Sequence, residues 1–190
     1  MNTPAHTFVN LVVLGRKASG KYVIPVVLGS VLPDIPMFIF YFVEKVIRGT
    51  PEKVIWHESY FHPLWQNLFD LFHSVPLIGL GLIGAWLAKS RVFLYLLGSM
   101  LLHIAFDFPL HHSDAHRHLF PFSNWRFESP ASYWDPAYFG NIMGPMEALA
   151  VIICCIVLLR RHRSATGRFA ISGLASVYVA YIYFTFSVWG

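Results

Sequence analysis

Charged residues are scarce in this chain. Lys, Arg, Asp and Glu together make up 13% of its 190 residues, whereas hydrophobic residues make up 56%. A soluble domain usually carries about 25% charged residues. So little polar surface argues against an ordinary soluble domain and predicts an integral membrane protein, and the length fits one compact helical domain. The net charge of +4 comes mainly from basic residues in short loops, so it indicates membrane topology and gives no sign of a nucleic-acid partner.

Cysteine is almost absent, and so are several familiar signatures. The two cysteines, Cys154 and Cys155, are adjacent in an apolar stretch, where disulfide geometry is poor, so we interpret both as apolar packing residues. The sequence contains no C-x-x-C motif and no H-E-x-x-H zinc motif. The first residues lack the basic region and the cleavage site of a secretory signal, so we expect the first apolar stretch to be retained.

Long hydrophobic stretches are what the chain has in place of charge. A membrane span needs roughly 20 apolar residues, and the candidate spans are residues 22–47, 67–88, 92–109, 143–160 and 169–189. Residues 4–14 form a helix too short to span, and the Leu-Pro-Asp-Ile-Pro segment at 32–36 is predicted to break the first span. We predict an all-α, polytopic transmembrane helical bundle of about five spans plus a short N-terminal helix. It forms a single membrane domain over residues 1–190.

Basic residues indicate how this bundle is oriented. Alternating spans place three basic turns on one side, which is expected to be cytoplasmic. The segment 110–142, rich in His, Asp, Trp and Pro, is then non-cytoplasmic, together with Lys45, Arg48 and Lys53, which do not follow the rule. The residues of the three turns are Arg16, Lys17, Lys21, Lys89, Arg91, Arg160, Arg161, Arg163 and Arg168.

Ionisable residues inside the apolar stretches are the strongest functional signal. Such groups are costly in a membrane and are usually functional. His103 and Asp107 are four residues apart, so they share one face of a helix and can reach one metal ion. Further ionisable residues have a similar predicted depth in the outer half of the bundle, and we expect them to meet there. These are His6, Asp34, His73 and Glu147.

Imidazole and carboxylate together suit a divalent metal, with zinc first and iron or manganese as alternatives. Three or four protein ligands would leave an open position for chemistry. Two purely structural interpretations stay open. Asp34 can cap the helix that follows it, and His73 can be a packing residue. Asp70, one turn before His73, can instead orient its ring.

The polar loop after Asp107 carries a second set of candidates. His111, His112 and Asp114 are our candidates for catalysis, and with His116 they could equally form an outer layer around the metal, an acid–base group or a second metal site. They could also line a solvated loop without binding anything. Arg117 and Arg126 could bind a phosphate or an anionic headgroup, or simply face lipid headgroups.

Four short motifs resemble a bacterial inner-membrane metal-dependent hydrolase family, sometimes described as LexA-binding. The resemblance covers about residues 3–122 and implies a multi-pass protein of the bacterial inner (cytoplasmic) membrane, with metal ligands at His6, Asp34, His73, His103 and Asp107. Parts of the His-rich loop also resemble small proteobacterial membrane proteins described as cobalamin-biosynthesis proteins. The four motifs are Thr3-Pro-Ala-His6, Gly29-Ser-Val-Leu-Pro-Asp34, Phe72-His73-Ser74 and His103-x-x-x-Asp107.

The leading hypothesis is a membrane-embedded metal-dependent hydrolase that acts on an ester or phosphoester. Its partners would be membrane lipids and a small-molecule or lipid substrate. A metal-ion or small-solute transporter is the second hypothesis, because transporters use broken helices at mid-depth. A non-catalytic membrane assembly protein with a polar core is the third.

Overall fold

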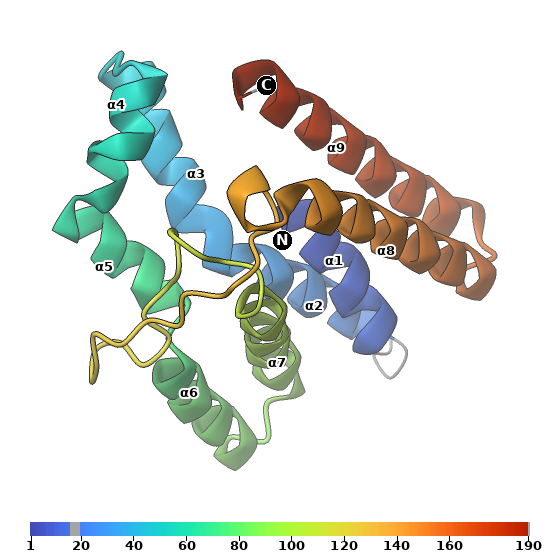
Figure 1. Cartoon of the computed structure of the whole chain (residues 1–190). Coiled ribbons are helices and arrows are strands. Elements are labelled where there is room, and N and C mark those ends of the chain that lie inside the picture. The colour runs from blue at the N-terminus through green and yellow to red at the C-terminus, as the bar shows by residue number, and fades with distance from the viewer. Residues whose placement is uncertain (16–19, 190) are drawn as a thin grey trace.

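The computed structural model describes residues 1–15 and 20–189, without the side chains of residues 186, 188 and 189. No β-strand occurs in these residues, so the all-α prediction is confirmed for the part of the chain that is described. The α-helices are α1 (Thr3–Val13), α2 (Val23–Val31), α3 (Ile35–Phe42), α4 (Glu52–His57), α5 (Pro63–Phe72), α6 (Val75–Leu87), α7 (Arg91–Asp107), α8 (Gly140–Arg161) and α9 (Ala165–Trp189) (Figure 1).

Three helical segments among the described residues are long and apolar enough to cross a membrane: Gly20–Ile47, Pro63–Leu87 and Gly140–Arg161. The chain is therefore a membrane protein, as its composition predicts. Five spans are not supported, and this part of the prediction is corrected. The predicted span 92–109 corresponds to α7, which has 17 residues and is shorter than the roughly 20 that a span needs. The predicted span 169–189 corresponds to α9, which is not among the three.

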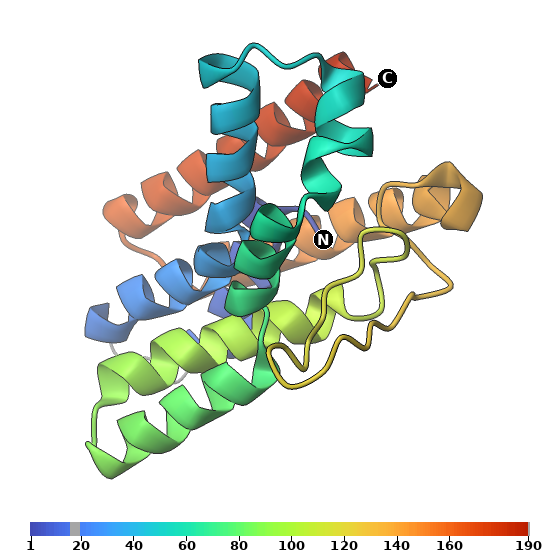
Figure 2. The ribbon, with the colours of Figure 1, turned by 90° about the vertical axis from the view of Figure 1, so that its left-hand side faces the viewer.

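Two of the three apolar segments are broken within their length. The first changes from α2 through a 3-10 turn, Leu32–Asp34, to α3, and this is the break that Pro33 and Pro36 predict. The second breaks between α5 and α6, where Ser74 caps α6 by accepting a hydrogen bond from Leu77 N at 3.2 Å. Figure 2 shows that α3 and α5 run across the direction of α2, α6 and α7. The apolar segments are therefore bent, and each bend opens a helix end inside the fold.

Helix α7 packs directly against α2, and α1 is buried beside both. A Cβ added to Gly29 would lie 2.1 Å from Leu96 O, so the two backbones touch there. Small and polar side chains allow such close approach between membrane helices and join them by hydrogen bonds. Asn10 of α1 donates from Nδ2 to both Ser99 O and Ser99 Oγ at 2.8 Å, and Ser99 Oγ donates to Val26 O at 2.6 Å. These hydrogen bonds fix α1, α2 and α7 relative to one another.

Aromatic packing holds the other half of the fold together. Phe40 of α3, Ile55 of α4 and Phe69 of α5 form a buried cluster with Tyr60, which lies in the 3-10 turn Ser59–Phe61 before α5. The Phe40 ring meets the Phe69 ring edge to face, with 5.7 Å between the centroids. This cluster holds α3 and α5 side by side, so the break before α3 and the break after α5 lie close to each other.

Gly29 offers a test of the contact between α2 and α7. The substitution Gly29→Ala should destabilise the protein by about 1–3 kcal/mol, because the new methyl group must displace the α7 backbone. The matched control is Gly98→Ala, since a Cβ at Gly98 meets nothing within 4 Å and alanine favours a helix. Thermal unfolding in detergent, followed by tryptophan fluorescence, measures both. Equal midpoints for the two variants would contradict the close contact.

Candidate metal centre

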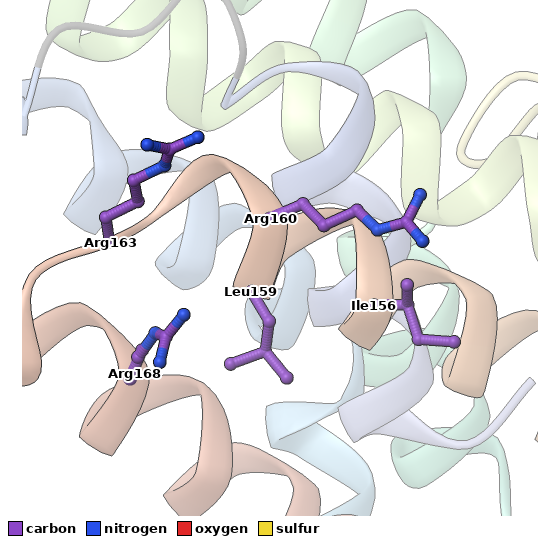
Figure 3. A pocket seen from close by; sticks show the side chains of 5 residues that line it. All are labelled: Ile156, Leu159, Arg160, Arg163 and Arg168. Carbon is purple, nitrogen blue, oxygen red and sulfur yellow. The ribbon is translucent and has the colours of Figure 1, made fainter.

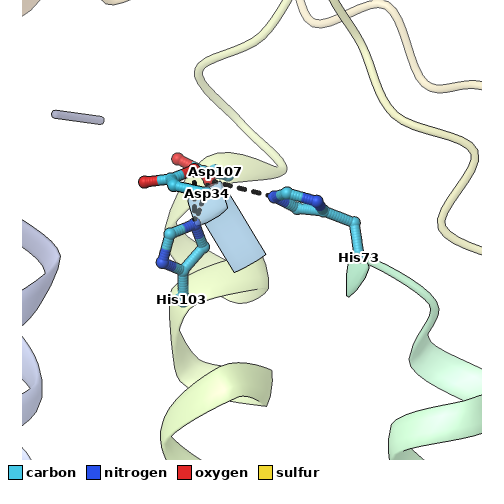
Figure 4. Close-up of side chains that lie close together, drawn as sticks. All are labelled: Asp34, His73, His103 and Asp107. Carbon is cyan, nitrogen blue, oxygen red and sulfur yellow. Dashed lines mark ion pairs between the residues drawn. The ribbon is translucent and has the colours of Figure 1, made fainter. Parts of the chain in front are cut away.

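Four side chains from separate parts of the sequence meet inside the fold. Asp34, His73, His103 and Asp107 each offer one ligand atom, and these atoms all lie within 4.8 Å of one another. In Figure 4 the two imidazole rings approach the carboxylates from different directions. His73, His103 and Asp107 are buried, whereas the side chain of Asp34 is 21% exposed. The predicted convergence of these four residues is therefore present, with Asp34 on its accessible side.

Helix ends place three of the four side chains. Asp34 closes the 3-10 turn after α2, His73 is the residue after α5, and Asp107 is the last residue of α7. Helix ends leave backbone groups without helical partners, which a membrane interior tolerates only where protein or water satisfies them. The same breaks that bend the apolar segments therefore place Asp34 and His73 in the cluster.

Backbone carbonyls orient both imidazole rings. Nδ1 of His103 lies 2.8 Å from Ser30 O, and Nδ1 of His73 lies 2.9 Å from Phe69 O. A carbonyl can only accept, so each ring carries its proton on Nδ1 and turns Nε2 toward the carboxylates. Histidine ligands of metals usually donate their other N–H in this way.

The Nε2 atoms meet the carboxylates without forming hydrogen bonds. Nε2 of His103 lies 2.8 Å from Asp107 Oδ2 and 3.5 Å from Asp34 Oδ1, and Nε2 of His73 lies 3.9 Å from Asp107 Oδ2. Yet neither Nε2 atom has a hydrogen-bond partner in the described residues. The distance of 2.8 Å from Nε2 of His103 to Asp107 Oδ2 is short enough for a hydrogen bond, so it is the angle that prevents one: Nε2 does not point at this oxygen. Imidazole nitrogens and carboxylate oxygens that all lie within 4.8 Å of one another suit a shared cation.

The other oxygen of Asp107 faces a second set of groups. Nε2 of His6 lies 2.9 Å from Asp107 Oδ1, Nε2 of His111 lies 3.4 Å from it, and the amino group of Met1 lies 2.6 Å from it. The His6 ring also stacks on His103 with 3.6 Å between the centroids. His6 therefore belongs to the same polar centre, on the opposite edge of Asp107 from His73.

His111 and Asp114 form a buried pair beside this centre. Nδ1 of His111 lies 2.9 Å from Asp114 Oδ2, which also accepts a hydrogen bond from Trp134 Nε1 at 3.0 Å. Burial lowers the pKa of His111, but the carboxylates of Asp114 and Asp107 outweigh this effect and raise it to about 9. Burial raises the pKa of Asp114, and the His111 ring reverses the shift and holds that pKa below its usual range. The pair thus lies at the edge of the centre, with Nε2 of His111 3.4 Å from Asp107 Oδ1.

Other sequence candidates have different surroundings. Nδ1 of His112 lies 2.7 Å from Ser129 O, and its ring stacks on Tyr138 with 3.5 Å between the centroids, so its contacts are within the loop. Glu147 accepts hydrogen bonds from Asn2 N and Asn2 Nδ2 at 2.9 and 2.7 Å and anchors the start of α1.

Asp70 does not orient His73. It accepts hydrogen bonds from the backbone and the guanidinium of Arg117 instead. Arg117 also donates to Asn67 and Asn124, and Arg126 donates to Gln66 at 2.9 Å. Both arginines therefore fasten the loop after α7 to α5, and Arg117 pairs with the Asp70 carboxylate.

The structure adds contacts that the sequence analysis missed. Thr3 Oγ1 donates to Asp34 Oδ2 at 2.5 Å, and no rule of spacing connects these two residues. Asp34 stands at the N-cap position of α3, but its side chain accepts no capping hydrogen bond. The capping alternative for Asp34 therefore loses its support, and its carboxylate is directed into the centre.

Comparison with known proteins identifies no similar protein. No protein-family model, no curated protein and no solved structure matches this chain. The resemblance to the inner-membrane hydrolase family remains a prediction. The support for a function comes from the geometry of the centre.

Metal content gives a direct test of the centre. Purified protein should contain at least one divalent ion per chain, and His103→Ala should lose it, because Nε2 of His103 is close to both carboxylates. The matched control is His57→Ala, since His57 is exposed on α4 and contacts only Lys53 O at 2.9 Å. Acidification should release the ion from the wild type, because protons compete for the ligands. Elemental analysis that finds equal content in both variants would contradict the site.

Proposed function

We propose that this protein is a membrane-embedded, metal-dependent hydrolase of esters or phosphoesters. The observation that supports it most is the set of Nε2 atoms of His73 and His103, which face two carboxylates without hydrogen bonds. Imidazole and carboxylate ligands suit zinc first, with iron or manganese as alternatives. The resemblance of the four motifs to a hydrolase family agrees with this chemistry.

The residues around the centre can divide the work of hydrolysis. A bound divalent ion would supply a Lewis acid that activates water and polarises the substrate oxygen. The Asp114–His111 pair lies next to Asp107 and can hold or deliver a proton there. Asp34 is the exposed member of the cluster, so solvent and substrate reach the centre on its side.

A membrane lipid is the substrate class that fits this location. The ligands lie at breaks within apolar helical segments, where a water-soluble substrate would have to leave its solvent. In Figure 2 the turns α6–α7 and α8–α9 lie toward one side of the molecule and the His-rich loop lies toward the other. Basic turns on the cytoplasmic side would place the loop outside an inner membrane.

Transport of a metal ion is the second candidate function. Discontinuous helices with ligands at the breaks are typical of transporters, and both Asp34 and His73 stand at such breaks. Uptake of a divalent ion into proteoliposomes, without turnover of any ester, would favour this candidate over hydrolysis.

Hydrolysis can be measured in detergent with three kinds of substrate: a nitrophenyl carboxylic ester, a nitrophenyl phosphoester and a fluorescent phospholipid. The wild type should cleave at least one of them, and a chelator should abolish the activity until a divalent ion is returned. Asp34→Asn should reduce turnover to background, because the amide is a poor metal ligand. His57→Ala should match the wild type. Absence of turnover on the whole panel by metal-loaded protein would refute the proposal.

The role of the Asp114–His111 pair can be separated from metal binding. Asp114→Asn should slow turnover by about 100-fold, the usual size of an acid–base contribution, and should keep the metal. The reason is that Asp114 touches His111 and Trp134 but none of the four clustered ligands. If Asp114→Asn lost its metal as well, the pair would serve the site's structure and not proton transfer.

A further inference from the structure

A second binding site lies at the other end of the molecule, in the turn that joins α8 to α9. A cavity of about 780 Å³ opens there, lined by Ile156 and Leu159 of α8 and by Arg160, Arg163 and Arg168. Figure 3 shows Arg163 and Arg168 on one side of Leu159 and Arg160 on the other. The lining combines apolar side chains on the span with three guanidinium groups at its end.

These three arginines have no counter-charge nearby. No Asp or Glu follows Glu147 in the sequence, and in the part of the chain that is described no guanidinium of the three makes an ion pair or a hydrogen bond. Arg161 differs, because its Nη1 donates to Val12 O at 2.7 Å and ties α8 to the end of α1. The cavity therefore gathers three positive charges that no acidic side chain neutralises.

The helix that follows increases the need for an anion. Arg168 lies in the first turn of α9, and that turn has no acidic residue. The N-terminal end of a helix carries partial positive charge and disfavours a cation there. An anion in the cavity would interact favourably with the guanidinium groups and with this helix end together.

The position of the cavity indicates where the anion comes from. Helix α8 is one of the candidate membrane spans, so its last turn lies at the depth of lipid headgroups. Ile156 and Leu159 precede the arginines along the span and can contact an acyl chain, while guanidinium groups bind phosphate oxygens in pairs. Basic pockets at the cytoplasmic ends of spans are typical of sites for anionic lipid headgroups.

We propose that the cavity between the ends of α8 and α9 binds the phosphate headgroup of an anionic phospholipid. The site is separate from the metal centre and does not depend on hydrolysis. Arg160, Arg163 and Arg168 hold the phosphate, and Ile156 and Leu159 contact the first part of an acyl chain.

The test compares two triple variants of equal charge. One is Arg160→Gln/Arg163→Gln/Arg168→Gln, and the control is Lys21→Gln/Lys89→Gln/Arg91→Gln, which removes three charges from the other basic turns. Lipid retention is measured by native mass spectrometry after reconstitution with equal amounts of phosphatidylglycerol and phosphatidylcholine. Thermal unfolding confirms that both variants are folded.

The wild type and the control should retain phosphatidylglycerol over phosphatidylcholine, and the arginine variant should lose about tenfold or more of this preference. Glycerol phosphate at millimolar concentration should not displace the lipid. If both triple variants lost the preference for phosphatidylglycerol equally, the preference would come from the net charge of the protein and not from this cavity, and the proposal would be overturned. Displacement by glycerol phosphate would identify a soluble phosphate as the ligand and also overturn it.

Discussion

The buried carboxylate of Asp107 is the constraint on which the rest of the fold depends. Its two oxygens are approached by His103 and His73 on one side and by His6 and His111 on the other. An isolated carboxylate in an apolar interior is strongly unfavourable, so α1, α5 and the loop after α7 must all deliver a compensating group to this point. That requirement explains why a short helix such as α1 is buried completely at its first turns.

Broken helices are the means by which distant segments reach Asp107. A break in a helix changes the direction of the chain, so that a side chain at the helix end can point into the interior of the fold. At the end of α2 the 3-10 turn shifts the pairing, so that Ile35 N bonds to Leu32 O, and Ser30 O accepts the Nδ1 proton of His103. At the end of α5 the loop after α7 compensates the break, because Val75 N donates to His118 O at 2.9 Å. Each break therefore contributes one ligand and is stabilised by another part of the centre.

Much of the centre could be predicted from residue types, but its geometry could not. Spacing alone pairs His103 with Asp107, and the prolines at 33 and 36 mark the break that exposes Asp34. The break at His73 was missed because hydropathy measures how apolar a segment is on average and not its direction, and residues 67–88 are mostly apolar. Hydropathy also overcounted the spans, because α7 is apolar but has 17 residues, fewer than a span needs. The carbonyl that orients His103 belongs to Ser30, 73 residues earlier in the sequence, whereas the one that orients His73 belongs to Phe69, four residues earlier. No common sequence pattern could identify both.

The charges of the four clustered side chains favour a divalent cation. Asp34 and Asp107 would give a bound ion two negative charges, and His73 and His103, whose Nδ1 protons are donated to carbonyls, would bind it through Nε2 as neutral rings. The amino group of Met1 lies 2.6 Å from the other oxygen of Asp107 and adds a positive charge there, which disfavours a cation of higher charge. Asp34 is the member of the cluster that solvent reaches, because His73, His103 and Asp107 are enclosed by protein. Thr3 donates to Asp34 Oδ2, so α1 holds the most exposed member of the cluster in place.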